Sequence, residues 1–493
     1  MADQPFVARA AISDDRFQLA HLATAFGAAL AGRAQLLFFP FDHEVRDVHE
    51  VPGPRNLHTV PAAPLVLKPG RAGETVKAIR QARSRKMERL FEESVREVSR
   101  LVPLSPDERS ILEDAEAAAG ELITSEFEKY LERKPNPEVP RILARHGLMG
   151  VPILEKYGGR GARQLVQALF LERLGQVGMG PVTFIDVHQC LGSLTIQDWG
   201  TDEQKQRYLG RAAKGDVVLA YGLTEPEAGS DPSSLSTTFE KDGSGYKISG
   251  SKYLISNGST ATHVLVFAYP KGRSVGLTAF LVDAKQKGFN VDMRLEEKAG
   301  LFTCDTSLLS FDEVSVPSED AIGGEGKGFA VAYSALLNGR IGVGSGCLGV
   351  MEDCLNQTAE RAKSRVQHGK AIGKHQLIQK HIAFIASSLE ASRWLVYRAA
   401  MKKEDYEKSP SDLALRREAD RLSAIAKYTA SRSAFESADR ALQVFGGFGY
   451  SIMSPVAKHF LDTRVARIYE GTDEIMELKI ASSVLGKGFE AYR

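Results

Sequence analysis

Hydrophobic residues along this chain recur with two spacings, and the spacing changes twice. Residues 105–216 carry the three- and four-residue spacing of helices, most clearly at 165–174 and 187–199. Between 217 and 322 apolar and polar residues alternate as in short strands, at 246–256, 262–269, 276–283 and 308–316. The helical spacing then returns over 329–365, 376–401, 413–445 and 473–485. The pattern predicts two helical blocks with an all-β domain between them.

These changes divide the chain into four predicted regions of an α+β multidomain fold. Residues 104–216 form an N-terminal helical domain, in which Ser105 or Asp107 caps the first helix. Residues 217–325 form a central antiparallel β-barrel or sandwich, and 326–493 a C-terminal four-helix bundle. Residues 1–103 form an extension without an assigned fold.

Two stretches of the extension have a distinct character. The proline-rich stretch 51–70 is typical of a linker or covering arm. A predicted helix at 77–89 is strongly basic and presents either a solvated face or a docking face for an acidic partner or phosphates.

Composition narrows the class of function. The 493 residues are 43% hydrophobic and 25% charged, which is ordinary for a globular protein that buries large cores. Lys and Arg number 63 against 62 Asp and Glu, so the net charge of +1 gives no electrostatic case for nucleic acid. The four cysteines form no CxxC pair, and no histidine stands at zinc spacing. We therefore expect no disulfide framework and no metal site.

The first residues of the chain and its apolar runs indicate where in the cell the protein is expected. The first residues carry Asp3, Asp14 and Asp15, which is unlike a signal or transit peptide. No uninterrupted apolar run reaches membrane-spanning length. The sequence predicts a cytoplasmic protein that acts on a small molecule.

A glycine pattern in the C-terminal block resembles a nucleotide-binding motif. Gly344, Gly346 and Gly349 spell GxGxxG, but they lie within a helical apolar run and no strand precedes them. A dinucleotide fingerprint needs a strand before the glycines and a helix after them. Close packing between helices is the better interpretation.

The stretch 221–231 reads YGLTEPEAGSD and follows the apolar run 217–220. Pro226 fixes one backbone angle and Gly229 allows close approach, so the loop is expected to hold a defined shape. One interpretation is a hairpin loop with ordinary turn chemistry. However, the string TEPEAGSD resembles the flavin-contacting signature of the acyl-CoA dehydrogenase family.

Four further stretches resemble motifs of the same family in the same order. They are SKYLISNG at 251–258, RVQHGKAIGKHQ at 365–376, QVFGGFGY at 443–450 and RIYEGTDEI at 467–475. The resemblance covers residues 104–493 and implies FAD-dependent removal of two hydrogens from an acyl-CoA thioester, giving the 2,3-enoyl-CoA.

Glu470, in the YEGT motif, is the catalytic base that the resemblance implies. The α proton of a thioester is weakly acidic, so the enzyme needs a base and a site for charge on the carbonyl oxygen. Burial beside an acyl chain raises the pKa of a glutamate toward the working pH. Considered alone, Glu470 could instead be an exposed residue that stabilises the N-terminus of the helix at Asp473. The segment Asn338–Arg340, where some family members carry the base, has no acid.

The resemblance also assigns ligand contacts. The FAD contacts that it implies are Tyr221, Leu223, Thr224, Ser230, Leu254, Ser256, Arg365, His368, Gln376, Gln443, Gly446, Gly447, Thr472 and Glu474. The acyl-CoA contacts that it implies are Ser230, Arg340 and Gly471. In the family tetramer, the segments around Arg365 and Gln443 hold the adenine end of FAD across a subunit interface, which implies a homo-oligomer, a dimer or a tetramer.

Three features depart from the family pattern. Leu254 replaces a tryptophan that lies against the flavin, and His368 replaces a phenylalanine. Residues 1–103 have no counterpart in short family members. Electron-transferring flavoprotein is the implied electron acceptor, but Leu254 leaves open an acyl-CoA oxidase or a flavin monooxygenase. A non-catalytic binding protein of this fold is a further alternative. No arginine stands at 182–189, which favours a neutral acyl chain.

Overall fold

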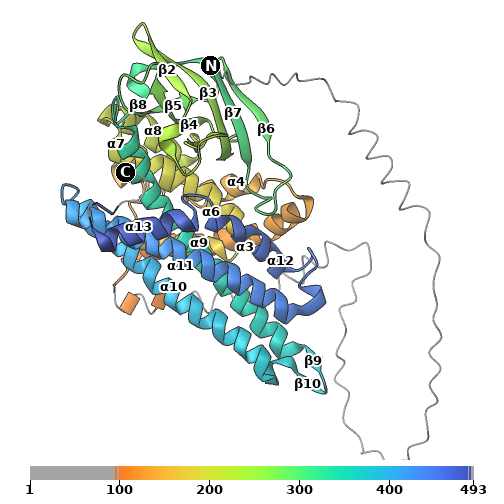
Figure 1. Cartoon of the computed structure of the whole chain (residues 1–493). Helices are drawn as coiled ribbons and strands as arrows, with labels where there is room; N and C mark the ends of the chain where they lie inside the picture. Colours follow the sequence, from red (N-terminus) through yellow and green to blue (C-terminus); the bar gives the residue numbers. More distant parts are fainter. Residues whose placement is uncertain (1–94, 97–98, 101, 487, 490–493) are drawn as a thin grey trace, which may run out of the picture. The chain divides into compact units, whose positions relative to one another are not determined.

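The computed structural model describes residues 95–96, 99–100, 102–486 and 488–489. The predicted linker at 51–70 and the basic helix at 77–89 lie outside these residues. Within them, a helical block, a sheet and a second helical block follow one another along the chain, as the hydrophobic spacing predicts (Figure 1).

The first block is helical throughout. Its helices are α3 (Pro106–Glu132), α4 (Glu138–Arg145), α5 (Gln164–Gly175), α6 (Met179–Asp186), the π-helix η2 (Val187–Ser193), α7 (Leu194–Trp199) and α8 (Asp202–Lys214). Ser105 caps α3 through a reciprocal capping box with Glu108, which confirms one of the two predicted caps. The helix predicted at 187–199 begins earlier, at Met179, because every residue of α6 is buried and α6 has no polar face to reveal it.

The central block is built on one eight-stranded sheet. Its strands are β1 (Leu219–Gly222), β2 (Thr238–Asp242), β3 (Gly245–Ser256), β4 (His263–Pro270), β5 (Thr278–Asp283), β6 (Phe289–Arg294), β7 (Thr306–Pro317) and β8 (Ala321–Ile322). The order is β6-β7-β3-β2-β4-β5-β8, and β1 pairs with β4. Most neighbours are antiparallel as predicted, but β1 and β2 each run parallel to β4. The loop after β1 is therefore not a hairpin loop.

Among the strands that the sequence prediction missed are β2 and β6. β2 and β6 expose most of their side chains and carry almost no apolar residues on a buried face. They are held in the sheet by pairing, β2 with β3 and β4 and β6 with β7, and such pairing leaves no period-two signal in the sequence.

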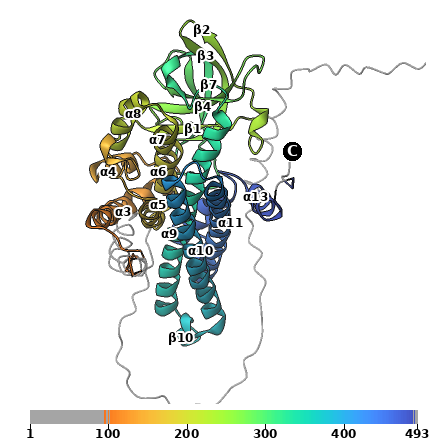
Figure 2. The ribbon, with the colours of Figure 1, turned by 90° about the vertical axis from the view of Figure 1, so that its left-hand side faces the viewer.

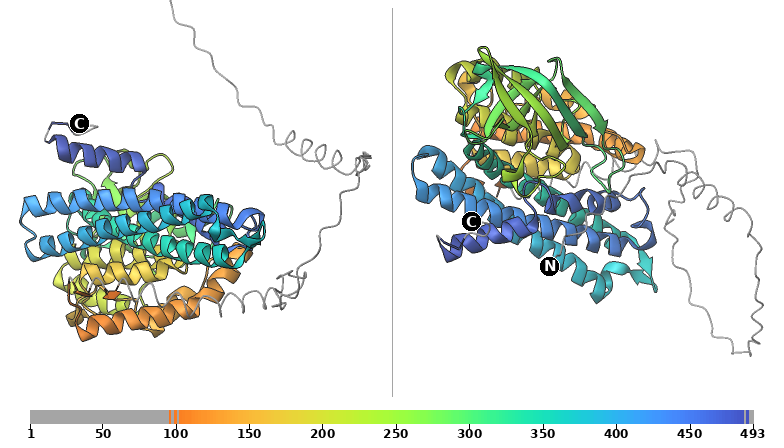
Figure 3. Two further views of the ribbon diagram at one scale, coloured as in Figure 1. Left: turned by 90° about the horizontal axis from the view of Figure 1, so that it is seen from below. Right: turned by 45° about the horizontal axis from the view of Figure 1, so that its top comes forward.

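The last block is dominated by three long helices. They are α9 (Gly328–Ser364), α10 (Gln376–Lys408) and α11 (Leu413–Phe445), which pack along one another, and the shorter α12 (Pro455–Thr463) and α13 (Asp473–Leu485) pack against α11. The views from the side and from below show these helices alongside α5 and the other helices of the first block (Figures 2 and 3).

The GxGxxG pattern lies inside α9 and serves close packing, as predicted. A Cβ atom added to Gly349 would come within 1.9 Å of the Glu172 carbonyl oxygen of α5, and one added to Gly175 would come within 2.2 Å of the Gly346 carbonyl oxygen. The glycines therefore let the backbones of α5 and α9 approach each other more closely than any other residue would allow.

The cysteines and the helix lengths complete the description. All four cysteines are buried free thiols. No helix in the described part of the chain is both long and apolar enough to cross a membrane. A cytoplasmic location stays a prediction.

Candidate functional site

The loop after β1 is held by a buried ion pair. Lys252 of β3 places its Nζ 2.7 Å from the Glu225 carboxylate, and their side chains are 0% and 2% exposed. Lys252 also donates to the Leu223 carbonyl oxygen, at 3.2 Å. The Glu225 carboxylate accepts further hydrogen bonds from Ser236 and the Thr237 N–H. The loop therefore has the defined shape that Pro226 and Gly229 predict.

A bulge in β3 lies beside this loop. The pairing of β3 with β7 shifts register between Lys252 and Ile255, and Leu254 within the shift has φ 59°. The Tyr253 N–H donates to the Thr224 carbonyl oxygen at 2.9 Å, which joins the two segments. As a result the apolar side chain of Leu254 is 47% exposed beside the polar groups of the loop.

Glu470 occupies a strained turn between the short helix η7 (Arg464–Arg467) and α13. Its φ is 55°, in the left-handed region that residues other than glycine rarely adopt, and Gly471 follows with φ 103°. Two cations hold the turn from neighbouring helices. Arg340 Nε of α9 lies 3.4 Å from the Glu470 carbonyl oxygen, and Lys427 Nζ of α11 donates to the Gly471 carbonyl oxygen at 2.6 Å. These contacts fix a conformation that the chain would not adopt alone.

The Glu470 carboxylate points inward, toward α9. A Cβ atom added to Gly339 would come within 2.2 Å of Glu470 Oε2, so the carboxylate fills the space that a side chain would need. Glu470 Oε2 is buried and accepts no hydrogen bond from the described residues. Burial raises the pKa of Glu470, while contact with the Asp186 carboxyl group and the charges of Lys427 and Arg340 oppose that rise.

This geometry excludes the alternative interpretation of Glu470. An exposed glutamate stabilising α13 would lie at the helix end, but Thr472 is the N-cap and its side chain accepts from the Ile475 N–H at 3.3 Å. Glu474, another predicted cofactor contact, is exposed on the first turn of α13.

The sequence analysis missed a second carboxyl group beside Glu470. Asp186, the last residue of α6, lies against Gly342 of α9, and its carboxyl group interacts with that of Glu470. The signal was present, because Asp186 is the one acid in the apolar stretch 177–194.

Tyr221 and an apolar wall stand near the two carboxyl groups. Tyr221 packs with Val187, Leu191 and Ala335, and its hydroxyl donates to the Ala332 carbonyl oxygen at 3.3 Å. Burial, and then the Glu470 charge, raise the pKa of Tyr221. This wall suits an apolar group placed beside Glu470.

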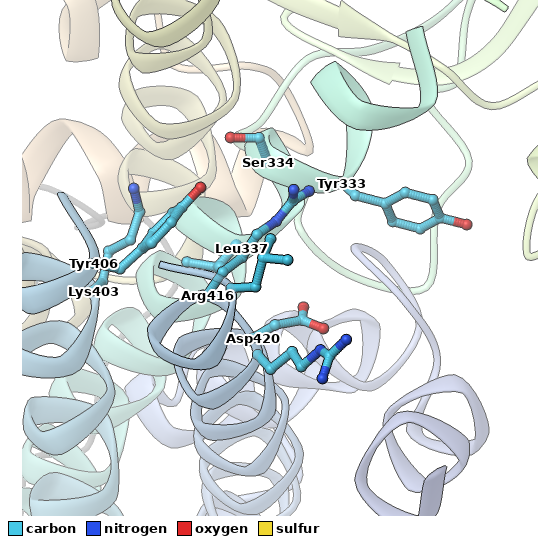
Figure 4. A pocket seen from close by; sticks show the side chains of 9 residues that line it. Tyr333, Ser334, Leu337, Lys403, Tyr406, Arg416 and Asp420 are labelled. Carbon is cyan, nitrogen blue, oxygen red and sulfur yellow. The ribbon is translucent and has the colours of Figure 1, made fainter. Parts of the chain in front are cut away.

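Arg340 is buried among protein groups. Its Nη1 lies 3.1 Å from Asp420 of α11, in addition to the contact with the Glu470 carbonyl oxygen. Asp420 lines a cavity of about 230 Å³ between α9, α10 and α11 (Figure 4). Three cations, Lys403, Arg416 and Arg417, line the same cavity with Tyr333 and Tyr406. The sequence analysis missed this cavity, because its residues come from three helices distant in the sequence.

The structure separates the predicted ligand residues into two groups. Tyr221, Leu223, Thr224, Leu254 and Ser256 gather at the end of β1 and the β3 bulge, with the exposed Ser230 further along the loop. The residues around the hairpin of β9 (Val366–Gln367) and β10 (Lys370–Ala371) lie at the end of the long helices away from the sheet (Figures 1 and 2).

The second group is exposed and shares a small apolar cluster. Ile372 and Val444, which neighbour its two segments, pack together on Ala362. The exposed members of the group are Arg365, His368, Gln376, Gln443, Gly446 and Gly447. Among the described residues no hydrogen bond or ion pair joins them to Glu470, so one chain by itself does not unite the two groups.

Comparison with known proteins identifies the family. Three family models match in chain order: acyl-CoA dehydrogenase N-terminal domain at 105–216, middle domain at 220–314 and C-terminal domain at 326–485. The chain belongs to the acyl-CoA dehydrogenase family. The resemblance stated from the five motifs is thereby confirmed.

Individual members of the acyl-CoA dehydrogenase family agree over most of their length. An acyl-CoA dehydrogenase of Bacillus subtilis is 37% identical over 374 residues, covering 75% of this chain and 94% of the relative. The structure of butyryl-CoA dehydrogenase from Megasphaera elsdenii superposes with a TM-score of 0.73 at 35% identity, covering 78% of this chain and 99% of that one. An acyl-CoA dehydrogenase complexed with FAD from Bacillus anthracis gives a TM-score of 0.73 at 29% identity, covering 78% and 67%.

FAD is the cofactor of this family, and the residues near β1 fit it. A flavin ring needs an apolar surface for its face and hydrogen-bonding groups for its polar edge. The 47% exposed Leu254 supplies apolar surface, and the half-buried Thr224 and Ser256 supply hydroxyl groups in the same place. The ion pair beneath the loop keeps these groups in position.

We expect Glu225→Gln to destabilise the protein by about 3 kcal/mol at neutral pH, because it leaves the buried Lys252 ammonium without its counter-charge. Burial acts to raise the pKa of Glu225, but Lys252, Thr237 and Ser236 outweigh burial and lower the pKa from 4.5 to about 2. A lowered pKa stabilises the fold above the unfolded value and loses that effect as the pH falls through the folded value. The difference from wild type, measured by urea unfolding, should narrow from about pH 4.5 toward about pH 2.

The matched control is Glu227→Gln, since Glu227 is an exposed acid of the same loop. It should leave the free energy of unfolding within about 0.5 kcal/mol of wild type. Equal effects of the two substitutions would show that the ion pair does not stabilise the loop.

Proposed function

We propose that this protein catalyses the FAD-dependent α,β-dehydrogenation of an acyl-CoA thioester to the 2,3-enoyl-CoA, with Glu470 as the base. The orientation of Glu470 carries the proposal. Its carboxylate is turned inward by a strained backbone and lies beside an apolar wall rather than in solvent. Such backbone strain at a buried acidic side chain is typical of a catalytic position.

Glu470 would take the α proton of the thioester, and bound FAD would supply the acceptor for the hydride from the β carbon. A raised pKa makes the carboxylate a stronger base, and the charges of Lys427 and Arg340 limit that rise. In the described part of the chain no group accepts a hydrogen bond from the Glu470 N–H. That donor is therefore free to bind the thioester oxygen, as the resemblance implies.

The cavity between α9, α10 and α11 supports binding of the CoA part of the substrate. Arg340 and Lys479 already neutralise its one acid, Asp420, and Lys403 pairs with Glu407 at 3.0 Å, so Arg416 and Arg417 leave an excess of positive charge. Arg416 and Arg417 make no ion pair within the described residues. Phosphate groups of CoA would complement this charge.

The acyl group that fits best is short and neutral. The wall of Val187, Leu191 and Ala335 is apolar, and the butyryl-CoA dehydrogenase to which the chain is similar acts, by its name, on a short acyl group.

A second copy of the chain would complete the FAD site. The adenine-binding residues that the resemblance implies lie apart from Glu470, and large apolar side chains around them are exposed: Val366, Leu377, Phe448, Tyr450 and Ile452. A homo-oligomer, either a dimer or a tetramer, would cover these apolar side chains and bring the adenine-binding residues to the FAD of the partner. Electron-transferring flavoprotein is the electron acceptor that the family resemblance supports.

Glu470→Gln should abolish reduction of the flavin by substrate, because an amide cannot accept the α proton. Mixed anaerobically with butyryl-CoA, the yellow wild-type protein should bleach, and the variant should bleach at least about 100-fold more slowly while retaining its flavin. Glu477→Gln, which changes an exposed acid of α13, is the control and should bleach like wild type. Undiminished bleaching of the Glu470 variant would remove Glu470 from this role.

Arg416→Gln and Arg417→Gln should each raise the butyryl-CoA concentration that gives half-maximal bleaching about fivefold, without changing the limiting rate. Higher salt should reduce the difference, because salt screens exposed charges. Arg421→Gln, on the next turn of α11 and outside the cavity, is the control. If all three variants saturate like wild type, the CoA phosphates bind elsewhere.

Leu254 is the reason to test a second candidate function, that of an acyl-CoA oxidase on the same fold. A leucine covers less of a flavin ring than the tryptophan of the family pattern, so oxygen has easier access to the ring. We expect substrate-reduced protein to reoxidise slowly in air, with less than stoichiometric hydrogen peroxide in the first turnover, and rapidly with electron-transferring flavoprotein. A stoichiometric burst of peroxide would establish the oxidase instead.

A further inference from the structure

Two carboxyl groups meet on a glycine surface of α9. A Cβ atom at Gly342 would come within 1.8 Å of Asp186 Oδ1, just as one at Gly339 would come within 2.2 Å of Glu470 Oε2. Gly339 and Gly342 are three residues apart and therefore adjacent on one face of the helix. The missing side chains leave space on this face for two carboxyl oxygens, one from a residue of α6 and one from the turn before α13. Helix α6 packs against α9 (Figure 1).

Neither of these oxygens has a conventional donor. Asp186 is 2% exposed, and Asp186 Oδ1 and Glu470 Oε2 are both buried without a hydrogen-bond partner in the described part of the chain. Two carboxylates held against each other in a buried site cannot both remain ionised, because their repulsion adds to the cost of burial. The pair must therefore hold a proton.

We propose that Asp186 holds this proton and donates it in a hydrogen bond to the Glu470 carboxylate, so that Asp186 acts as a positioning residue for the base. The inference rests on the proposed function of Glu470 but concerns a residue that no family motif quoted above contains. In this arrangement Asp186 fixes the orientation and the ionisation of Glu470.

The surroundings decide which of the two acids is neutral. Lys427 of α11 and Arg340 of α9 lie on the Glu470 side, where their charges favour the carboxylate. Around Asp186 there is no cation among the groups that shift it: they are Glu470 itself and the Cys190 thiol of η2. Tyr221 of β1 faces Glu470 with a neutral hydroxyl, since its pKa is raised. Burial and the Glu470 charge raise the pKa of Asp186 well above its ordinary value.

The proton count of the reaction is consistent with this arrangement. The Cα–H bond breaks and its proton passes to Glu470, whose carboxylate becomes neutral, while the Asp186 proton stays where it is. A neutral Asp186 stabilises the Glu470 anion before the transfer without adding a second negative charge. An ionised Asp186 would instead repel that anion and raise its pKa further.

Infrared spectroscopy of the flavin-loaded protein with ¹³C-labelled aspartate tests where the proton is. At neutral pH we expect an isotope-shifted carbonyl band of a protonated aspartic acid that is missing in Asp186→Asn and retained in Glu470→Gln. A wild-type minus Asp186→Asn difference spectrum without such a band would overturn the proposal. This measurement does not depend on turnover. The proposal for Asp186 can therefore be rejected while the Glu470→Gln bleaching test supports Glu470 as the base, and the opposite combination is equally distinguishable.

The pH dependence of anaerobic bleaching by butyryl-CoA tests the effect on Glu470. Asp186→Ala removes the donor and should move the acid limb of the rate profile upward by about one pH unit. Asp186→Asn keeps a donor of the same shape and should leave the acid limb within a few tenths of a unit of wild type. A downward move in Asp186→Ala would mean that Asp186 is an anion, and an unmoved limb would mean that it only fills space; either result overturns the proposal. If Asp186→Ala does not fold, the infrared carbonyl band and the acid limb of the rate profile of Asp186→Asn still test the proposal.

Discussion

The turn that carries Glu470 depends on two buried cations. Arg340 and Lys427 reach successive carbonyl oxygens, those of Glu470 and Gly471, from two different helices. A left-handed conformation at a residue other than glycine costs on the order of 1 kcal/mol, so the surrounding helices must enforce it. The same two charges oppose the rise that burial causes in the pKa of the Glu470 carboxylate. The two cations therefore act on both the backbone geometry and the acidity at this position.

Most of the fold followed from hydrophobic spacing. Long helices such as α10 and α11, and buried strands such as β4, leave strong periodic signals, and Ser105 marks the start of α3. The failures share one cause. The exposed strands β2 and β6 and the wholly buried helix α6 have no contrast between two faces, so no period distinguishes them.

The candidate site was predictable only where its residues lie within short motifs. TEPEAGSD and YEGT located the loop after β1 and the turn at Glu470. Asp186 could not be assigned a partner from the sequence, because its neighbour Glu470 is distant in the chain and the contact depends on two glycines of a third segment. The cationic cavity was hidden for the same reason. The motifs around Arg365 and Gln443 were found readily, and the structure places the hairpin of β9 and β10, which follows Arg365, at the end of the long helices away from the sheet (Figure 2).

One small side chain limits how the site can open. Asn257, buried in the turn after β3, donates from its amide to the Phe184 carbonyl oxygen at 2.9 Å and to the Leu219 carbonyl oxygen at 3.2 Å. It thereby clamps α6 of the helical domain to β1 of the sheet. A hinge motion that parted these two domains would break both bonds inside the protein, at a cost of about 1–3 kcal/mol for each group left bare. Such a hinge motion is therefore disfavoured, and movements of side chains and loops over this frame are the less costly route for ligand entry.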